Sequence, residues 1–548
     1  MKVLLIIKKT LNQNGVPLIK LEFGIKEIGR VTNKREARDY TRINRIILLN
    51  VNSIFSSSTK QYCYGKTVIH SNMNLVLAAL AAQSINISVG LCQGYSAILL
   101  PQLAVDRPDF TAEQASWIAS LGVISNPIGA LMGGIMVDGL GRKATLQAIV
   151  VPGLIGWSTI ALSTSYAALC VGRFITGFTI ATYIYVAEVA TPLSRGVLAA
   201  VGPALVSLGI FMVYVLGSFV HWKTVAFVCA IISFLTPILM QMVPESPLWL
   251  ASKGRAKEAY ESMYWLRQNN NLAQTELDEF SKGNSTEMEC TFMDKVRSVR
   301  RWSVLKPFMT LLVFFMFQEL SGIYIILYYA VDFFKGVGTN VNEFTASMIV
   351  GGIRVIMGVF GACLINQIRR KVLATTSGVL LSLTMLGAAV CDTLGGSPWI
   401  KLVCVLGHVC ASMIGFLQLP WIMSGELYPQ KIRGIMSGAT TCCAYILIFL
   451  NIKTYPNLVE VVTTNGTLYM FGGCALIGAV FCAVFLPETR GKSLTEITQG
   501  FEDEGKIPHQ EDCESKKVDN TVVKRKHSVP NIPTKNGTAL KAERKLSI

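Results

Sequence analysis

The chain has 548 residues, of which 51% are hydrophobic and 15% are charged, and its formal net charge is +16. Soluble proteins carry about 25% charged residues, so this composition excludes an ordinary soluble protein. The positive charge does not indicate nucleic-acid binding, because Lys and Arg crowd the tails and a few loops between apolar stretches. A lipid bilayer is therefore a predicted partner, and nucleic acid is not.

Twelve apolar stretches follow one another along the chain, and each is long enough to cross a bilayer as a helix of about 20 residues. Because backbone groups in lipid must be satisfied internally and barrel-like alternation is absent, all twelve are predicted as helices. The predicted spans are 75–97, 115–136, 144–164, 167–189, 198–219, 222–242, 307–330, 344–366, 373–392, 399–424, 435–454 and 468–486. The chain is predicted to be an all-α membrane protein with twelve transmembrane helices.

These spans divide the chain into five predicted parts. They are a basic N-terminal tail (1–72), a six-helix bundle (73–242), a charged linker with short helices (243–306), a second six-helix bundle (307–487), and a mostly disordered C-terminal tail (488–548).

The linker contains one predicted amphipathic helix. The stretch Arg255–Arg267 has apolar residues at helical spacing, with Ala259, Met263 and Leu266 on one side.

Lys and Arg are distributed unevenly between the two sets of loops. They concentrate in both tails and in the loops at 138–143, 243–306 and 369–371. The opposite loops carry only a few, namely Arg107, Lys223, Lys335, Lys401 and Lys453. By the positive-inside rule, both termini and the linker are predicted to be cytoplasmic in a multi-pass protein of the plasma membrane.

Three short motifs occur once in each half of the apolar region. The pairs are Gly134–Lys143 with Asn366–Lys371, Glu188–Gly196 with Glu426–Gly434, and Pro244–Ser246 with Pro487–Thr489. Each offset is roughly half the hydrophobic region, as a duplicated membrane bundle predicts. The two bundles are therefore predicted to be six-helix pseudo-repeats.

The cysteines and other reactive residues do not predict chemistry. Most of the fourteen cysteines lie inside apolar spans without zinc-ligand spacing, and the exterior loops are poor in them. We find no phosphate loop, metal-ligand cluster or triad, so we predict neither an enzyme nor a metal or cofactor site.

Among the glycosylation sequons, Asn284 and Asn536 fall on the cytoplasmic side, and only Asn465 falls in a predicted exterior loop. Asn465 is therefore the predicted glycosylation site.

Taken in order, the motifs resemble the sugar porter family of the major facilitator superfamily over about residues 73–495. Besides the repeated motifs, the resemblance rests on Gly172–Phe174, Pro244–Pro247, Gln318–Gly322, Pro420–Trp421 and Pro487–Gly491. The stretches Gly94–Gln102 and Ala115–Ser120 are most similar to insect facilitated trehalose transporter-like proteins. The resemblance implies the major facilitator fold and transport by alternating access, without a cofactor.

The resemblance also implies a central substrate site. The family's sugar-contacting positions in the seventh, eighth and tenth helices are occupied here by Gln318, Glu319, Tyr324, Arg354 and Trp421. Gln318 keeps the family's amide and Trp421 its aromatic ring, whereas the other three replace amides. Tyr328 and Tyr329 match the family's outer gate.

Glu319 and Arg354 are predicted to form an ion pair. At 1.5 Å per residue, both lie near the middle of a core about 30 Å thick, on consecutive helices. A lone charge there costs about 2.5–3.5 kcal/mol, so each needs a partner. The pair either lines the central cavity or is buried away from the solute.

Charged residues at the predicted cytoplasmic helix ends form a candidate gating network. Its members are Asp138, Arg142, Glu188, Arg195, Glu245, Arg370, Glu426, Arg433 and Glu488. We predict that they latch the two halves together in the outward-open state. The alternative is that they anchor helix ends in the headgroup region.

The predicted function is facilitative uniport of a sugar such as trehalose or a hexose. A proton-coupled symporter remains an alternative. The resemblance implies that proton-coupled members of the family pair an acidic residue of the first helix with the arginine at Arg173. Ser96 occupies that acidic position here, so Glu319 would have to carry the proton instead. Arg173 itself is predicted to bond helix carbonyls or to snorkel. A non-transporting sugar sensor is a further alternative. The identity of the sugar or polyol and the oligomeric state remain open.

Overall fold

The computed structural model describes residues 73–178, 184–191, 194–286, 302–338, 341–428 and 432–490. Residues 1–71 and 72–548 group as two separate units. All described residues belong to the second unit, and the description concerns that unit by itself. The predicted N-terminal tail, most of the predicted C-terminal tail and Asn536 lie outside the described residues, as does the side chain of Asn284.

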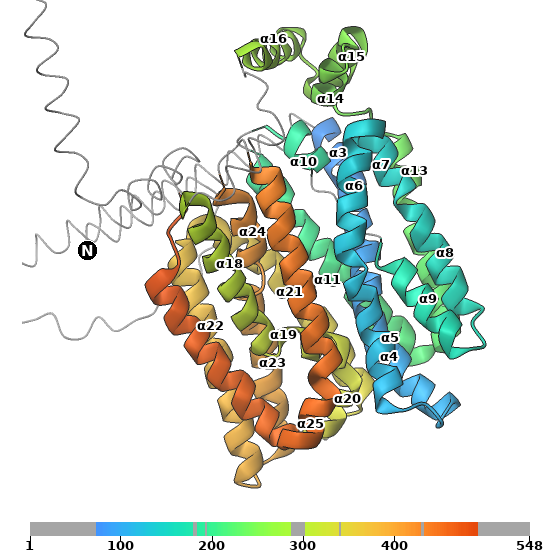
Figure 1. The fold of residues 1–548 in the computed structure, drawn as a ribbon, viewed down its shortest axis with the longest axis vertical. Helices are drawn as coiled ribbons and strands as arrows, with labels where there is room; N and C mark the ends of the chain where they lie inside the picture. The colour runs from blue at the N-terminus through green and yellow to red at the C-terminus, as the bar shows by residue number, and fades with distance from the viewer. Residues whose placement is uncertain are drawn as a thin grey trace, which may run out of the picture. The chain divides into compact units, whose positions relative to one another are not determined.

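The residues 73–242, called the first half, form six membrane-length segments (Figure 1). Segments 1 to 6 are α3 (Met73–Gln83) with α4 (Ile85–Asp106), α5 (Ala112–Ile124) with α6 (Asn126–Leu140), α7 (Arg142–Ala148) with α8 (Val150–Ala161), α9 (Tyr166–Thr176) with α10 (Ile184–Val189), α11 (Arg195–Phe219), and α12 (Trp222–Ser233) with α13 (Leu235–Gln241). Each coincides with one predicted span.

The residues 307–487, called the second half, form segments 7 to 12. These are α18 (Trp302–Leu320) with α19 (Ile323–Tyr328) and α20 (Ala330–Val337), α21 (Glu343–Gln367), α22 (Arg370–Thr393), α23 (Pro398–Ile414) with α24 (Leu419–Glu426), and α25 (Arg433–Phe485), which contains segments 11 and 12. The predicted bounds of the two halves stay predictions, and α18 begins ahead of its predicted start at 307.

The predicted exterior loop between the last two spans is wrong. Helical structure continues through 456–462, and the backbone leaves it only at Thr463, where φ is 68° and ψ is 165°. The residues in this stretch, such as Leu458 and Val461, continue the helix because no glycine or proline follows Pro456 until Gly466. Segment 11 is therefore longer than the predicted 435–454.

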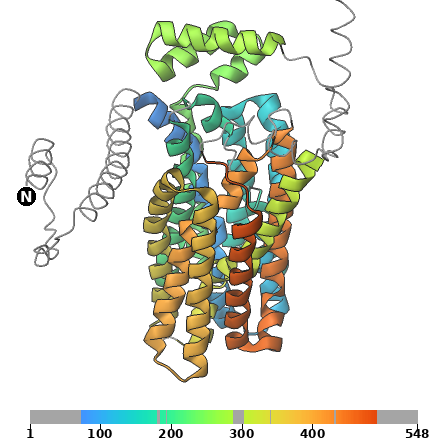
Figure 2. The same ribbon diagram turned by 90° about the vertical axis from the view of Figure 1, so that its left-hand side faces the viewer.

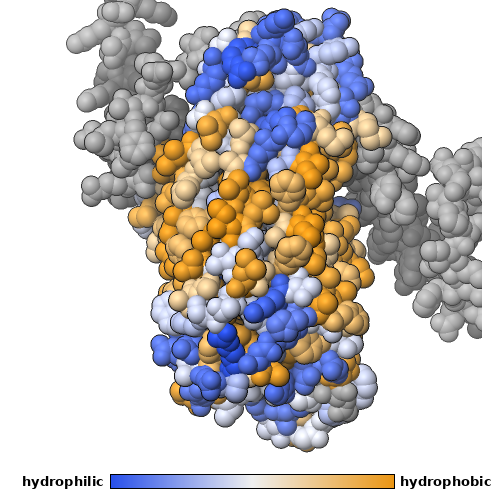
Figure 3. Space-filling view, turned by 90° about the vertical axis from the view of Figure 1, so that its right-hand side faces the viewer, coloured by the Kyte–Doolittle hydropathy of each residue, from blue (hydrophilic) through white to orange (hydrophobic). Residues whose placement is uncertain are grey.

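In the described part of the chain, nine helices are long and apolar enough to cross a membrane, and one of them, Gly434–Phe485, holds two segments. Segment 4 is divided by residues that are not described, and segment 7 is broken into three helices. On the face drawn in Figure 3, hydrophobic residues gather across the middle of the helices and hydrophilic residues at the two ends. This distribution matches a bilayer-spanning bundle.

Two segments are broken in the middle of the second half. Segment 7 breaks at Gly322, whose φ of +81° favours glycine and whose added Cβ would lie 2.5 Å from the Phe471 ring. Segment 10 breaks between Ile414 and Leu419. Broken helices free backbone groups, which inside a membrane must find partners within the protein.

The linker folds against the first half. It forms α14 (Pro247–Ser252), α15 (Ala256–Arg267) and α16 (Asn270–Thr286), at the top of the bundle in Figure 2. The predicted amphipathic helix is confirmed as α15, and its predicted apolar side chains are buried. We call this end of the bundle the linker end and the opposite end the far end.

Three polar contacts fix the linker helices in place. Within the linker, the Arg267 guanidinium donates to Glu276 at 2.9 Å. The same guanidinium donates to the Val189 carbonyl at 3.0 Å, and the Asn74 amide donates to the Trp265 carbonyl at 2.8 Å. The last two contacts tie the linker to the first half.

The two halves meet along several helices. The contacting pairs are α11 with α21, α25 with α5 and α6, and α4 with α19 and α20. Towards the far end, the Tyr214 hydroxyl donates to the Leu327 carbonyl at 2.7 Å, and Lys453 Nζ donates to Ser116 Oγ at 2.8 Å. The halves are thus joined by polar contacts at the far end.

Candidate functional site

Gln318 connects the two helix breaks. Its Nε2 donates to the carbonyls of Phe416 (3.2 Å) and Leu417 (2.7 Å), which the break in segment 10 leaves without helical partners. Gln318 is fully buried, and its Oε1 has no hydrogen-bond partner among the described residues. The amide nitrogen therefore holds segment 10 in place, and only the oxygen remains for a solute.

Glu319 is buried beside the break in segment 7. Its backbone carbonyl accepts a hydrogen bond of 2.9 Å from Asn451 Nδ2 in segment 11. Both carboxylate oxygens are buried. The Asn451 side chain interacts with the carboxylate, but no described group makes a hydrogen bond of good geometry to either oxygen. Such a buried acceptor pair is costly and requires an explanation.

The predicted ion pair between Glu319 and Arg354 is wrong. Arg354 is buried in α21, and its Nε has no partner within the described ranges. Tyr324 interacts electrostatically with both charged groups and therefore lies near each of them. The rise of 1.5 Å per residue predicts that both residues lie near the middle of the membrane, but it does not predict the direction in which each side chain leaves its helix. Glu319 lies beside segment 11, whereas Arg354 lies beside segments 5 and 7.

Trp421 belongs to an aromatic cluster in the second half. Its ring centroid is 4.8 Å from that of Phe315, edge to face, and 5.4 Å from that of Tyr445. Trp421 is only half-buried, whereas Tyr324 is buried. An aromatic face with free surface can take the apolar side of a sugar ring.

The two predicted gate tyrosines are placed differently. The Tyr329 hydroxyl donates to the Ile452 carbonyl at 3.1 Å, and its ring lies 5.0 Å from that of Tyr455, so it faces segment 11. Tyr328 interacts electrostatically with Cys92 and Arg173, so it faces the first half. Only Tyr328 is therefore positioned between the halves.

Gln418 is a candidate site residue that the sequence interpretation missed. It lies within the break of segment 10, is buried, and has an Nε2 without a hydrogen-bond partner in the described residues. A polar residue between Gly415 and Pro420, inside an otherwise apolar span, was the available signal. Segments 7, 8 and 10 contribute six buried atoms without such a partner. Besides His408 Nε2 in α23, they are a set of five, namely Gln318 Oε1, Glu319 Oε1 and Oε2, Arg354 Nε and Gln418 Nε2.

Arg173 is fully buried in the first half. Its Nε donates to the Ile118 carbonyl at 3.2 Å, Nη1 to the Cys92 carbonyl at 3.2 Å, and Nη2 to Ser96 Oγ at 2.6 Å. The prediction that Arg173 bonds helix carbonyls is confirmed, and Ser96 is a neutral partner for it.

The first charge cluster lies at the linker end of the first half. Arg142 Nη2 lies 2.6 Å from Glu188 Oε1, and Glu188 Oε2 accepts from Ser246 Oγ at 2.5 Å. Glu245 accepts hydrogen bonds from the backbone N–H groups of Arg142 (2.9 Å) and Lys143 (3.0 Å). These acceptors satisfy the free N–H groups at the start of α7.

Asp138 contributes less to this cluster. It is 3.9 Å from Arg142, and its side chain is 85% exposed. An exposed pair at that distance is worth little.

The second half repeats the cluster. Arg370 Nη2 lies 3.2 Å from Glu426 Oε1, and Thr489 Oγ1 donates to Glu426 Oε2 at 2.7 Å. Glu488 accepts from the backbone N–H groups of Arg370 (3.0 Å) and Lys371 (3.3 Å). The repeated motifs of the sequence thus build the same arrangement twice.

Among the described residues, no contact of either cluster joins the two halves. The first cluster ties the first half to Glu245 and Ser246 of the linker, and the second ties the second half to Glu488 and Thr489, which follow it. These contacts correspond to the alternative in which the charges anchor helix ends. The side chains of Arg195 and Arg433 lie outside the described residues. A latch formed by them between the halves therefore stays a prediction.

Glu245 and Glu488 are expected to stabilise their halves. Glu245→Gln and Glu488→Gln should each lower stability by about 2–3 kcal/mol, because hydrogen bonds to a charged group are stronger than neutral ones. The measurement is thermal unfolding of the purified protein. Glu258→Gln is the matched control. The Glu258 side chain is 51% exposed, so its ion pair with Arg255 contributes little to stability. Equal midpoints for all three variants would show that neither carboxylate anchors a helix.

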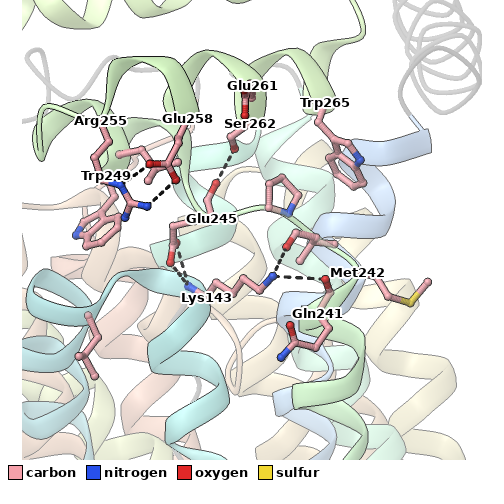
Figure 4. Close-up of a pocket in the computed structure, with 14 residues that line it drawn as sticks. Lys143, Gln241, Met242, Glu245, Trp249, Arg255, Glu258, Glu261, Ser262 and Trp265 are labelled. Atoms are coloured by element: carbon pink, nitrogen blue, oxygen red, sulfur yellow. Dashed lines mark hydrogen bonds and ion pairs between the residues drawn. The ribbon is translucent and has the colours of Figure 1, made fainter.

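A cavity of about 540 Å³ lies between the linker and the first half (Figure 4). Its walls include Lys143, Glu245, Trp249, Arg255 and Trp265. Most of its charged groups have partners: Lys143 Nζ donates to the Val243 carbonyl at 2.9 Å, and a hydrogen bond to Glu258 raises the pKa of Arg255. Glu261, which also lines the cavity, is exposed. Among the described lining residues, none contributes a buried side-chain atom without a hydrogen-bond partner, unlike the centre of the second half.

Asn465 directly follows the turn at Thr463. Its Nδ2 donates to Thr393 Oγ1 at 2.9 Å, and Thr467 is fully buried. Glycosylation at Asn465 stays a prediction, and it would replace this hydrogen bond.

With this geometry established, comparison with known proteins identifies the family. A family model described as "Sugar (and other) transporter" matches residues 48–501. The chain belongs to this family. The facilitated trehalose transporter Tret1 of Bombyx mori is 32% identical over 436 residues, covering 77% of this chain and 86% of that protein. The Tret1 of Apis mellifera ligustica is 32% identical over 443 residues, covering 78% and 88%. The resemblance to sugar porters is confirmed.

Solved structures establish the fold. The xylose transporter XylE from E. coli, in a partially occluded inward open conformation, matches with a TM-score of 0.66 at 20% identity, covering 77% of this chain and 100% of that chain. The major facilitator superfamily proton:xylose symporter XylE bound to 6-bromo-6-deoxy-D-glucose also gives 0.66 at 20% identity, covering 78% and 99%. The predicted twelve-helix major facilitator fold is confirmed, and the chain is a multi-pass membrane protein.

Proposed function

We propose that this sugar porter is a facilitative transporter that moves a sugar such as trehalose or a hexose by alternating access. The central set of five buried polar atoms without hydrogen-bond partners in the described chain carries the proposal. Three of the atoms accept hydrogen bonds and two donate them. Sugar hydroxyls both donate and accept, so one sugar can satisfy both kinds.

The position of this set also supports transport. Four of the five atoms belong to residues at the breaks of segments 7 and 10, and substrate sites of such carriers lie near the midplane at broken helices. The halves are joined at the far end through Tyr214 and Lys453. Alternating access then consists of breaking these contacts while others form at the linker end. In this proposal the membrane is the plasma membrane, and the linker end and both termini are cytoplasmic.

Purified protein in proteoliposomes tests the proposal. Uptake of labelled trehalose and labelled glucose should be saturable, should equilibrate without accumulating, and should not respond to a pH gradient. Empty liposomes are the control. Ligand binding without any flux would overturn transport and favour a sugar sensor.

A proton-coupled symporter is the second candidate, and the buried Glu319 carboxylate, which has no basic partner among the described residues, favours it. A carboxylate that changes its protonation could couple a proton to the sugar. Accumulation driven by an acidic exterior, and lost in Glu319→Gln, would establish coupling. Equilibrating uptake that is unchanged by the same gradient would exclude it.

Trp421 is expected to matter for uptake rather than for folding. Trp421→Ala should lower uptake about tenfold or more, because losing an aromatic contact of about 1.4 kcal/mol has that effect on binding. Trp399→Ala is the control, since Trp399 is 56% exposed at the start of α23. Uptake and surface level are measured for both. Normal uptake by Trp421→Ala at normal surface level would leave Trp421 a packing residue.

A further inference from the structure

Within the described part of the chain, Arg354 is a buried guanidinium without an acidic partner for its charge. It is 6% exposed, and among the described residues no hydrogen bond or ion pair to an acid satisfies it. Arginine stays charged inside proteins and offers five N–H donors. A charge of this kind in the middle of a membrane span marks a functional site.

The face of α21 that carries Arg354 points towards the other half. Gly351 and Gly358 lie three residues before and four residues after Arg354, so the three share one helical face. A Cβ on Gly351 would lie 3.0 Å from the Phe211 Cα, and one on Gly358 would lie 3.6 Å from Ser207 Oγ. Both neighbours are on α11, so Arg354 lies at the boundary between the halves, where the solute of an alternating-access carrier binds.

The groups around Arg354 are neutral. It interacts electrostatically with the phenols of Tyr214, Tyr324 and Tyr328. The Tyr214 hydroxyl donates to the Leu327 carbonyl and so does not donate elsewhere. Glu319 lies on the side of segment 11, near Asn451. The site thus holds a fixed positive charge, with hydroxyl groups beside it and a carboxyl group further away.

A carboxylate is the ligand group that fits this arrangement. Guanidinium groups bind carboxylates through two parallel N–H···O bonds, which a sugar hydroxyl cannot reproduce. The remaining free atoms of the site, Gln318 Oε1, the Glu319 oxygens and Gln418 Nε2, suit the hydroxyls of the same solute.

We propose that the preferred solute of this transporter is a sugar acid, such as a uronate, whose carboxylate binds Arg354. The inference rests on the proposed function, because it concerns the same central site. It narrows the substrate class from sugars in general to polyhydroxylated monocarboxylates, with neutral sugars as weaker solutes.

Three ligands with the same ring test the proposal, namely glucuronate, glucose and glucosamine. With wild-type protein in proteoliposomes, glucuronate should be taken up with a KM about tenfold or more below that of glucose, as a charge-assisted bidentate contact predicts. Glucosamine, which carries a positive charge, should be the poorest. The same order should hold for thermal stabilisation of the purified protein.

Variants assign the effect to one residue. Arg354→Gln should raise the KM for glucuronate to about that for glucose, so that the preference disappears. Arg354→Lys keeps the charge without the bidentate geometry and should retain part of the preference. Arg255→Gln removes an arginine from an exposed linker pair and should change nothing.

The outcomes separate this inference from the proposed function. If wild-type protein takes up trehalose or glucose but does not favour glucuronate, the inference is overturned and the sugar transporter remains. If it takes up none of the sugars, the proposed function itself fails. If Arg354→Gln fails to fold, the three ligands are compared on the wild type and on Arg354→Lys. A preference for glucose over glucuronate in both proteins would overturn the inference.

Discussion

Replacing Arg173 by leucine is expected to prevent the first half from reaching its folded state. The guanidinium is fully buried and bonds segment 1 through Cys92 and Ser96, and segment 2 through Ile118. Gly122 supports this geometry, because a Cβ there would lie 3.1 Å from Arg173 Nη2. Arg173 therefore joins three segments at one point.

Leucine would remove three hydrogen bonds from a charged donor and leave part of the space of the guanidinium empty. Hydrogen bonds to a charged group contribute about 1.5–3 kcal/mol each, and proteins are stable by only about 5–15 kcal/mol. Arg173→Leu should therefore reduce the amount of protein at the cell surface several-fold, and it should likewise reduce the yield of monodisperse purified protein. Arg173→Lys, which keeps a charged donor, should be less severe.

Size-exclusion profiles and surface labelling of tagged protein measure this effect. Arg255→Leu is the matched control, because its side chain is 50% exposed. A folded Arg173→Leu protein at the wild-type level would show that segments 1, 2 and 4 do not depend on this contact.

Much of the fold could be predicted because each apolar stretch has the length that a bilayer demands. Buried charge was also informative: the requirement that Arg173 find acceptors led to its carbonyl contacts. Repeated motifs predicted repeated geometry, since Glu245 and Glu488 accept from equivalent backbone groups in the two halves. In these cases a single physical requirement, such as the span length or a partner for a buried charge, could be met by only one kind of structure.

Directions around the helix axis could not be predicted from spacing alone. Counting residues along the spans predicts similar depths for Glu319 and Arg354, yet segment 7 is interrupted between Leu320 and Ile323, just after Glu319. Gln318, just before this break, binds carbonyls that the break in segment 10 leaves free. Likewise, nothing local to Gln418 shows that its amide lies inside a break rather than along a helix face.

Replacing Lys453 by methionine is expected to open the far end of the bundle. Lys453 Nζ, on segment 11, donates to Ser116 Oγ at 2.8 Å and lies 4.4 Å from the ring centroid of Trp117. The Trp117 ring also lies 6.2 Å from Phe449. Ser116 and Trp117 belong to the first half, so one cation on the second half holds both of them.

The expected effect is large because Ser116 and Trp117 are the only groups, among the described residues, that contact the Lys453 ammonium group. Because Trp117 is 38% exposed, the cation–π contact contributes about 0.5–1 kcal/mol, and the hydrogen bond from a charged donor contributes about 1.5–3 kcal/mol. Losing both should shift the equilibrium towards the far-end-open state by about 30-fold or more. Lys453→Arg keeps a cation for the indole and should recover most of the closed state.

Hydrogen exchange of the purified protein measures this shift without labels. Peptides covering 112–124 and 445–455 should exchange faster in Lys453→Met than in wild type, because the contact between α5 and α25 shields both. Lys335→Met is the matched control, since Lys335 is an exposed lysine in α20, at the same end of the bundle. If the two variants exchange alike in these peptides, Lys453 does not hold the far end closed, and closure there depends on helix packing alone.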